Sequence, residues 1–151
     1  MNSENNINLD TPLSLAWTAG FVDGDGWIGI ARQKRKGSDA ICHRLKFSIV
    51  QNDLEVLEFI QDVIGESSFI AKLKRTVSMN KQAYQLVYDS EHALRAIRKL
   101  RPFLKRKHFE ADIVEKMWVE GKMGQRPGPK GWPSFIYEIR EKWAQKLTRL
   151  K

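Results

Sequence analysis

Residues 15–28 of this 151-residue chain, LAWTAGFVDGDGWI, decide its fold, because they lead from a helix through a sharp turn into a strand. Thr11 can cap the helix, and Pro12 suits the first helical position, where no N–H is needed. The helix ends in Asp23-Gly24-Asp25-Gly26, where glycines free the backbone to turn between two carboxylates. A carboxylate at such a turn, beside an outward-facing carbonyl, is a good ligand set for a hard cation.

The same helix carries a face of nearly bare backbone, formed by Ala16, Ala19 and Gly20. Small residues let two helix axes approach closely, so we expect these three residues to form an interface with another helix. The sequence has no second helix of this kind, which favours a second copy of the chain as the partner. A symmetric pair would bring two Asp25 side chains together, and their repulsion would call for divalent cations between them.

Composition limits the classes of protein to which the chain can belong. A hydrophobic content of 42% and a length of 151 residues indicate one folded domain spanning 1–151, with a frayed N-terminus at 1–10. The apolar runs are too short to span a bilayer, the single Cys42 permits no internal disulfide, and no P-loop indicates a nucleotide cofactor. The net charge of +8 points to a polyanionic partner.

Two hairpins are predicted after the helix, each with an apolar and a basic face. Strand 27–36 places Ile28 and Ile30 on one face, and strand 41–51 alternates in the same way. In the second hairpin, Phe69 and Ala71 are expected on the apolar face of strand 69–76, opposite Tyr84 of strand 83–88. The basic faces carry no acidic residue, so we interpret them as a surface for double-stranded DNA, formed by Gly29, Ala31, Gln33, Arg35, Arg44, Lys46, Ser48, Ile70, Lys72, Lys74 and Gln85.

Helices are predicted between and after the hairpins. A capping box at Asn52-x-x-Glu55 begins one that ends at Gly65, and Ser90 caps another that stops before Pro102. Residues 108–151 form C-terminal helices around a Gly/Pro-rich loop at 121–133. The order is αββαββα, which indicates an α+β domain with an antiparallel sheet and its helices on one face.

The run Thr18-Ala19-Gly20-Phe21-Val22-Asp23-Gly24-Asp25-Gly26 resembles the LAGLIDADG motif of homing endonucleases. The resemblance implies a saddle-shaped DNA-binding sheet and, because the motif occurs once, a homodimer. It also implies that Asp25 is the essential metal ligand, assisted by the carbonyl of Gly24, while Asp23 orients the turn. Mg²⁺ is the expected ion, with Mn²⁺ expected to substitute.

Two further positions match the pattern of that family. Gln51 resembles the polar residue that orders the attacking water, and Lys107 matches a lysine that stabilises charge on the scissile phosphate. Lys107 can equally be one more phosphate-contacting lysine in a basic run. The chain departs from the family at Glu55, where some relatives carry a basic residue of the water network.

The resemblance implies a site-specific double-strand DNA endonuclease of the intron-homing type, which hydrolyses phosphodiesters with Mg²⁺ and leaves short 3′ overhangs. A strand of about ten residues covers about ten base pairs, so a dimer should read a pseudo-palindromic site of around twenty. The expected location is intracellular, wherever the host intron resides. The alternative is an RNA maturase or a non-cleaving DNA-binding module on the same scaffold.

Overall fold

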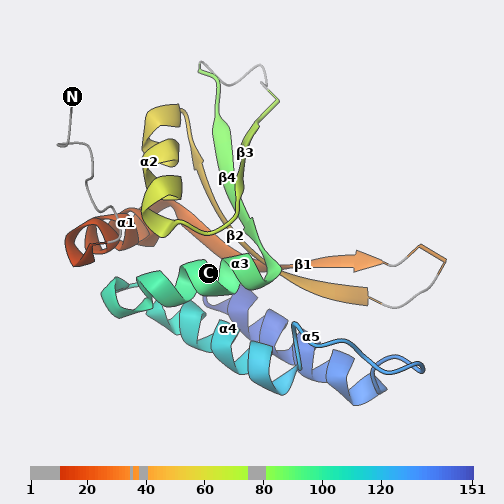
Figure 1. Cartoon of the computed structure of the whole chain (residues 1–151). Helices are drawn as coiled ribbons and strands as arrows, with labels where there is room; N and C mark the ends of the chain where they lie inside the picture. Colours follow the sequence, from red (N-terminus) through yellow and green to blue (C-terminus); the bar gives the residue numbers. More distant parts are fainter. Residues whose placement is uncertain (1–10, 35, 38–40, 75–80) are drawn as a thin grey trace, which may run out of the picture.

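The computed structural model describes residues 11–34, 36–37, 41–74 and 81–151. The expectations for residues 1–10 and for Arg35 therefore lie outside the described residues. Figure 1 shows the elements, which follow one another as α1 (Pro12–Asp25), β1 (Gly26–Lys34), β2 (Ile41–Gln51), α2 (Leu54–Ile64), β3 (Phe69–Lys72), β4 (Tyr84–Asp89), α3 (Ser90–Leu100), the 3₁₀ turn η2 (Arg101–Phe103), α4 (His108–Glu120) and α5 (Ser134–Arg149).

The strands form one antiparallel sheet in the order β1-β2-β4-β3, with the helices gathered on one of its faces (Figure 1). This confirms the predicted α+β class and the αββαββα order. The hydrophobic core lies between this face and the helices. It joins Phe47 and Tyr88 of the sheet to Val22 of α1, Ile60 of α2 and Ile97 of α3. In the described part of the chain no helix covers the other face of the sheet, which is typical of an antiparallel sheet that binds a partner or faces solvent.

Local signals set the ends of the helices. Thr11 caps α1 as predicted, since its Oγ1 accepts a hydrogen bond from the Ser14 N–H over 3.2 Å. The cap of α2 is Asp53 rather than Asn52, because the Asp53 carboxylate accepts from the Val56 N–H. Gly65 ends α2 at φ 73°, a left-handed conformation that favours glycine. Ser90 is not a cap: it is the first residue of α3 and has φ 51°.

The register of β3 corrects the expected face for this strand. Residues that pair directly across an antiparallel sheet lie on the same face, and Ile70 pairs with the fully buried Leu86. Ile70 and Lys72 therefore lie on the helix-covered face. Phe69 lies on the open face with an exposed fraction of 53%, opposite to the expectation. Apolar residues occur in both phases of β3, so alternation in the sequence does not identify its buried face. Only the pairing with β4 decides the register.

The outer part of the β1–β2 hairpin is braced by α5. Glu141 of α5 accepts hydrogen bonds from Arg32 Nε over 3.0 Å and lies 2.6 Å from His43 Nε2. The guanidinium of Arg32 and the contact with His43 lower the pKa of Glu141 to about 2, although partial burial opposes this shift. Arg98 of α3 is likewise paired with Glu115 of α4. Helix α5 thus packs against the outer part of the hairpin and holds it through Glu141.

Candidate functional site

The turn between α1 and β1 places the first candidate residues. Asp25 is the last residue of α1 and is exposed, and the side-chain amide of Gln51 donates a hydrogen bond to Asp25 Oδ2 over 2.8 Å. A side chain on Gly26 would lie 2.8 Å from the carbonyl oxygen of Val22, so the turn requires glycine there. The end of α1 and the end of β2 therefore bring Asp25 and Gln51 together, across 26 positions of sequence.

Asp23 does not face outward with Asp25. Its carboxylate accepts three successive backbone N–H groups, from Lys105 (2.8 Å), Arg106 (3.2 Å) and Lys107 (2.9 Å). Partial burial by itself raises the pKa of Asp23, but these hydrogen bonds outweigh it, so the pKa lies below its usual value. Asp23 anchors the segment before α4, which agrees with an orienting role and leaves it poorly placed to bind metal.

Lys107 is buried at the same turn, with only 8% of its surface exposed. Its Nζ donates a hydrogen bond to the carbonyl oxygen of Asp23 over 3.0 Å. A cavity of about 360 Å³ lies beside it, lined among others by Gly26, Trp27 and Glu110. Lys107 is therefore a buried cation next to the Asp25 turn, which distinguishes it from the exposed Lys105 and Arg106.

One stripe of α1 is exposed, although Trp17 on it packs edge-on against Phe59 of α2 with the ring centroids 5.3 Å apart. Its exposed residues follow helical spacing and are Leu13, Ala16, Trp17, Gly20 and Gly24. A side chain built on Gly20 would meet nothing within 4 Å. Ala19 was expected on this stripe, but it lies on the opposite side of the helix and is 0% exposed in the hydrophobic core. That placement removes Ala19 from the expected interface, whereas Leu13 and Trp17 lie on the exposed stripe.

The open face of the sheet carries many of the residues expected to bind DNA. Register and exposure place Ala31, Gln33, Arg44, Lys46 and Gln85 there. Lys74 is exposed beyond the end of β3. Gly29 and Ser48 share this face but are buried. The Trp27 ring covers Gly29, and Trp27 is also the direct strand partner of Ser48, which is 5% exposed.

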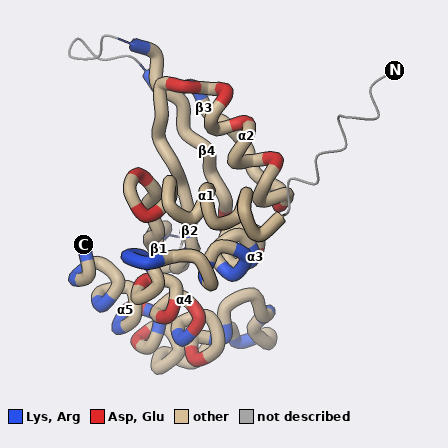
Figure 2. The backbone as a smooth tube through the Cα atoms, turned by 90° about the vertical axis from the view of Figure 1, so that its left-hand side faces the viewer, with Lys and Arg blue, Asp and Glu red and all other residues tan. Residues whose placement is uncertain are grey.

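Two residues of this face, Trp27 and Asp89, were not predicted from the sequence. Trp27 is 43% exposed and stands in the same phase as Gly29, so strand alternation alone could have found it. Asp89 pairs with Lys46 at the end of β4, and the face is therefore not free of acids. Its position just past the predicted strand end hid it. Figure 2 shows that Asp and Glu gather along α2, on the helix side of the sheet, whereas α5 carries many Lys and Arg residues.

The oxygen ligands at the α1–β1 turn are of the kind that a hard divalent cation prefers. Asp25 offers an exposed carboxylate, and the Gly24 carbonyl is among the last four of a helix, which lack intrahelical partners. Among the described residues of one chain, no group of three His, Cys, Asp or Glu side chains could hold a metal ion.

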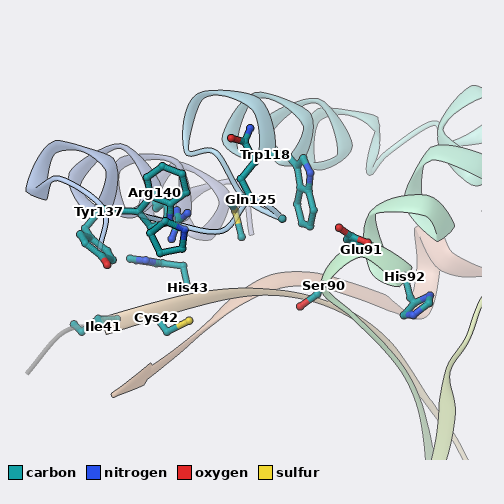
Figure 3. A pocket seen from close by; sticks show the side chains of 14 residues that line it. Ile41, Cys42, His43, Ser90, Glu91, His92, Trp118, Gln125, Tyr137 and Arg140 are labelled. Carbon is teal, nitrogen blue, oxygen red and sulfur yellow. The ribbon is translucent and has the colours of Figure 1, made fainter. Parts of the chain in front are cut away.

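A larger cavity of about 420 Å³ lies elsewhere, between the start of β2, the start of α3 and the loop before α5. In Figure 3, His43 of β2 faces Tyr137 and Arg140 of α5 in this cavity. Arg140 is held by the carbonyl oxygens of Gly121 and Lys122, and burial lowers the pKa of its guanidinium. Asp25, Gln51 and Lys107 do not line it, so it is separate from the candidate site.

No helix in the described parts of the chain is long and apolar enough to cross a membrane. Comparison with curated protein sequences gave no match. The fold is similar to that of the homing endonuclease I-CvuI in complex with its target, with a TM-score of 0.73, 22% identity, and coverage of 92% of this chain and 82% of I-CvuI. The fold is also similar to that of the archaeal intron-encoded homing endonuclease I-Vdi141I, complexed with DNA, with a TM-score of 0.71 and 17% identity. This match covers 92% of this chain and 84% of I-Vdi141I.

The meganuclease I-SmaMI, bound to uncleaveable DNA, is also similar, with a TM-score of 0.62 and 17% identity. This match covers 91% of the chain but only 43% of I-SmaMI. The model of the LAGLIDADG endonuclease family matches residues 18–111, from the motif helix to the start of α4 and more than half of the sequence. The chain therefore belongs to the LAGLIDADG endonucleases, a family of DNA-cleaving hydrolases.

Proposed function

We propose that two copies of this chain form a site-specific, Mg²⁺-dependent double-strand DNA endonuclease of the intron-homing type. The observation that carries the proposal is the contact between Asp25 and Gln51 at the end of a helix with a stripe of exposed residues. Pairing two such helices about a dyad would bring together two turns, each with one Asp25 and one Gln51. That arrangement would place two Asp25 carboxylates at one site.

Each residue at the turn has a proposed part. Asp25 and the Gly24 carbonyl would hold Mg²⁺, with Mn²⁺ as a substitute, and the bound ion supplies charge stabilisation at the scissile phosphate. Gln51 orders the attacking water through its amide group. Lys107 stabilises the charge that develops on the phosphate, since its buried ammonium stands beside the turn at Asp23.

The comparisons give this assembly indirect support. The chain covers most of I-CvuI but under half of I-SmaMI, which leaves room in the longer chain for a second domain of this size. I-CvuI and I-Vdi141I were each observed with DNA, and structures of I-CvuI were obtained in the presence of Ca and of Mg. We propose the same partner here: double-stranded DNA along the open face of the sheet.

Cleavage of a defined DNA tests the proposal. The purified protein is incubated with Mg²⁺ and a plasmid that joins the two sequences flanking the gene, which recreates the site before insertion. We expect one double-strand break with short 3′ overhangs, and no break with the Asp25→Asn protein. Specific binding without any cleavage would instead favour a non-cleaving DNA-binding module. Binding of the intron RNA alone would favour a maturase.

A further inference from the structure

Among the described residues of the open sheet face, Asp89 is the one acidic residue beside the basic ones. Asp89 Oδ2 lies 3.5 Å from Arg44 NH1 and 3.5 Å from Lys46 Nζ. All three side chains are partly exposed, at 43% for Arg44, 28% for Lys46 and 33% for Asp89. Two donors and one acceptor therefore stand side by side on the surface proposed to bind DNA.

The place of Asp89 in the chain makes this orientation unusual. Asp89 is the residue before α3, where an aspartate normally accepts the N–H groups of the first helical turn. It makes no such hydrogen bond. Its Oδ1 atom is buried without a partner, while Oδ2 faces Arg44 and Lys46. The carboxylate thus forgoes a helix cap and is held against the sheet face.

The backbone fixes this arrangement on both sides. Asp89 pairs directly with Lys46 in the antiparallel register, which puts the two side chains on the same face. The next residue, Ser90, turns the chain into α3 at φ 51°, a conformation that residues other than glycine rarely adopt. Asp89 is consequently the last strand residue on this face before the chain leaves the sheet.

We propose that Asp89, with Arg44 and Lys46, reads one G·C base pair of fixed orientation in each half-site. The inference rests on the proposed function and adds to it a residue that sets specificity. In the major groove a G·C pair presents the O6 and N7 acceptors of guanine beside the N4 amino donor of cytosine. Arg44 or Lys46 donates to the guanine, and Asp89 Oδ2 accepts from the cytosine. An A·T pair places its donor and acceptor in the wrong order for this set.

A carboxylate on such a face also opposes binding that depends only on charge. It repels any phosphate that approaches it when no base hydrogen bond compensates. A role limited to repulsion or to holding Arg44 in place would affect all DNA sequences alike. A role in base recognition affects one base pair. The two roles therefore differ in a measurable way.

The test is selection of bound duplexes from a DNA library randomised over about twenty base pairs, the length expected for two half-sites of about ten pairs. Wild-type protein is compared with Asp89→Asn, Arg44→Met and Lys46→Met. Asp62→Asn is the matched control, because it removes the same charge from the exposed surface of α2. Thermal unfolding of each variant confirms that it is folded.

We expect the wild-type consensus to contain one oriented G·C pair at symmetric positions of the two half-sites. Asp89→Asn should lower the preference for that cytosine by about tenfold and raise the acceptance of adenine, which asparagine recognises well. Arg44→Met or Lys46→Met should relax the guanine of the same pair. These variants also test the proposal if Asp89→Asn does not fold.

Three results would overturn the inference. In the first, Asp89→Asn and Asp62→Asn change the affinity for all DNA sequences equally and leave the base preference intact. In the second, Arg44→Met and Lys46→Met relax the preference at a different base pair from Asp89→Asn. Either result would leave the proposed endonuclease function standing. Selection of no DNA sequence by wild-type protein would remove the proposed function and the inference together.

Discussion

Asp23 and Lys107 bind each other at two points, although 84 positions separate them in the sequence. The Asp23 carboxylate accepts the backbone N–H of Lys107 over 2.9 Å, and Lys107 Nζ donates to the backbone carbonyl of Asp23 over 3.0 Å. In each hydrogen bond, the side chain of one residue binds the backbone of the other. The motif turn thereby fixes both the start of α4 and the position of the ammonium group.

We expect Asp23→Asn to impair cleavage by displacing Lys107. The asparagine side chain has one acceptor oxygen, where the carboxylate receives three N–H groups. The loss should lower the free energy of unfolding by about 1–2 kcal/mol, measured by urea unfolding. Asp53→Asn is the control, since it changes the cap of α2 to a residue that caps equally well. Wild-type cleavage in Asp23→Asn would separate Lys107 from the reaction.

Asp25→Asn should abolish cleavage while leaving specific binding unchanged or tighter. The substitution removes the charge proposed to hold the metal and relieves repulsion between the two carboxylates near the dyad. Gln51 can still hydrogen-bond to the asparagine side chain, so the turn should keep its shape. Gel-shift titrations and cleavage assays on the same DNA measure both effects. Cleavage at the wild-type rate would remove the proposed role of Asp25.

Gly20→Leu should yield a folded monomer without activity. Within one chain a Cβ atom at this position meets nothing within 4 Å, and leucine favours helix over glycine by roughly 0.5–1 kcal/mol. The chain itself should therefore be as stable as before, whereas the paired helices would be forced apart. Sedimentation reports the assembly, and Gly128→Leu, at another open position, is the control. A normal dimer in Gly20→Leu would place the interface elsewhere.

The corrected register of β3 predicts different effects for two neighbouring strands. Gln85 lies on the open face, whereas Lys72 lies on the helix-covered face. Gln85→Ala should relax the preference at one base pair in each half-site, and Lys72→Ala should leave the preference unchanged. Profiles of binding to all single-base variants of the target measure this. A relaxed base preference in Lys72→Ala would restore the phase of strand 69–76 that alternation in the sequence suggested.

Glu141→Gln should destabilise the protein in a pH-dependent way. The pKa of Glu141 is lowered to about 2 in the folded chain, chiefly by Arg32, from an ordinary value of 4.5. Its stabilising contribution is therefore complete above about pH 4.5 and is lost as the pH falls toward 2. Because Glu141 is partly exposed, we expect a difference of only about 1 kcal/mol at pH 7.

Urea unfolding of wild type and Glu141→Gln between pH 7 and pH 3 measures this difference. It should shrink as the pH falls below 4.5, the ordinary pKa of the carboxyl group. Glu138→Gln, at an exposed position of the same helix, should show little effect at any pH. A difference that stays constant over this range would mean that the charge of Glu141 does not stabilise the hairpin.

The sequence by itself determined the elements and their order. Local signals such as the cap at Thr11, the turn at Asp23–Gly26 and the break at Gly65 act within a few residues, so they can be read directly. The resemblance to the family also indicated Asp25 and Gln51, which the structure brings within hydrogen-bond distance. The strand phases of β1 and β2 were readable because their large apolar residues alternate along the sequence, namely Ile28, Ile30, Leu45, Phe47 and Ile49.

Only the tertiary structure decided what depends on pairing between distant segments. The face of Ile70 follows from its register with Leu86, and the burial of Ala19 follows from helices that pack against α1. Asp89 reached the sheet face because β4 pairs with β2 and because its carboxylate leaves the end of α3 unbonded. A sequence states which residues are apolar or charged, but their neighbours are set by contacts whose partners lie far along the chain.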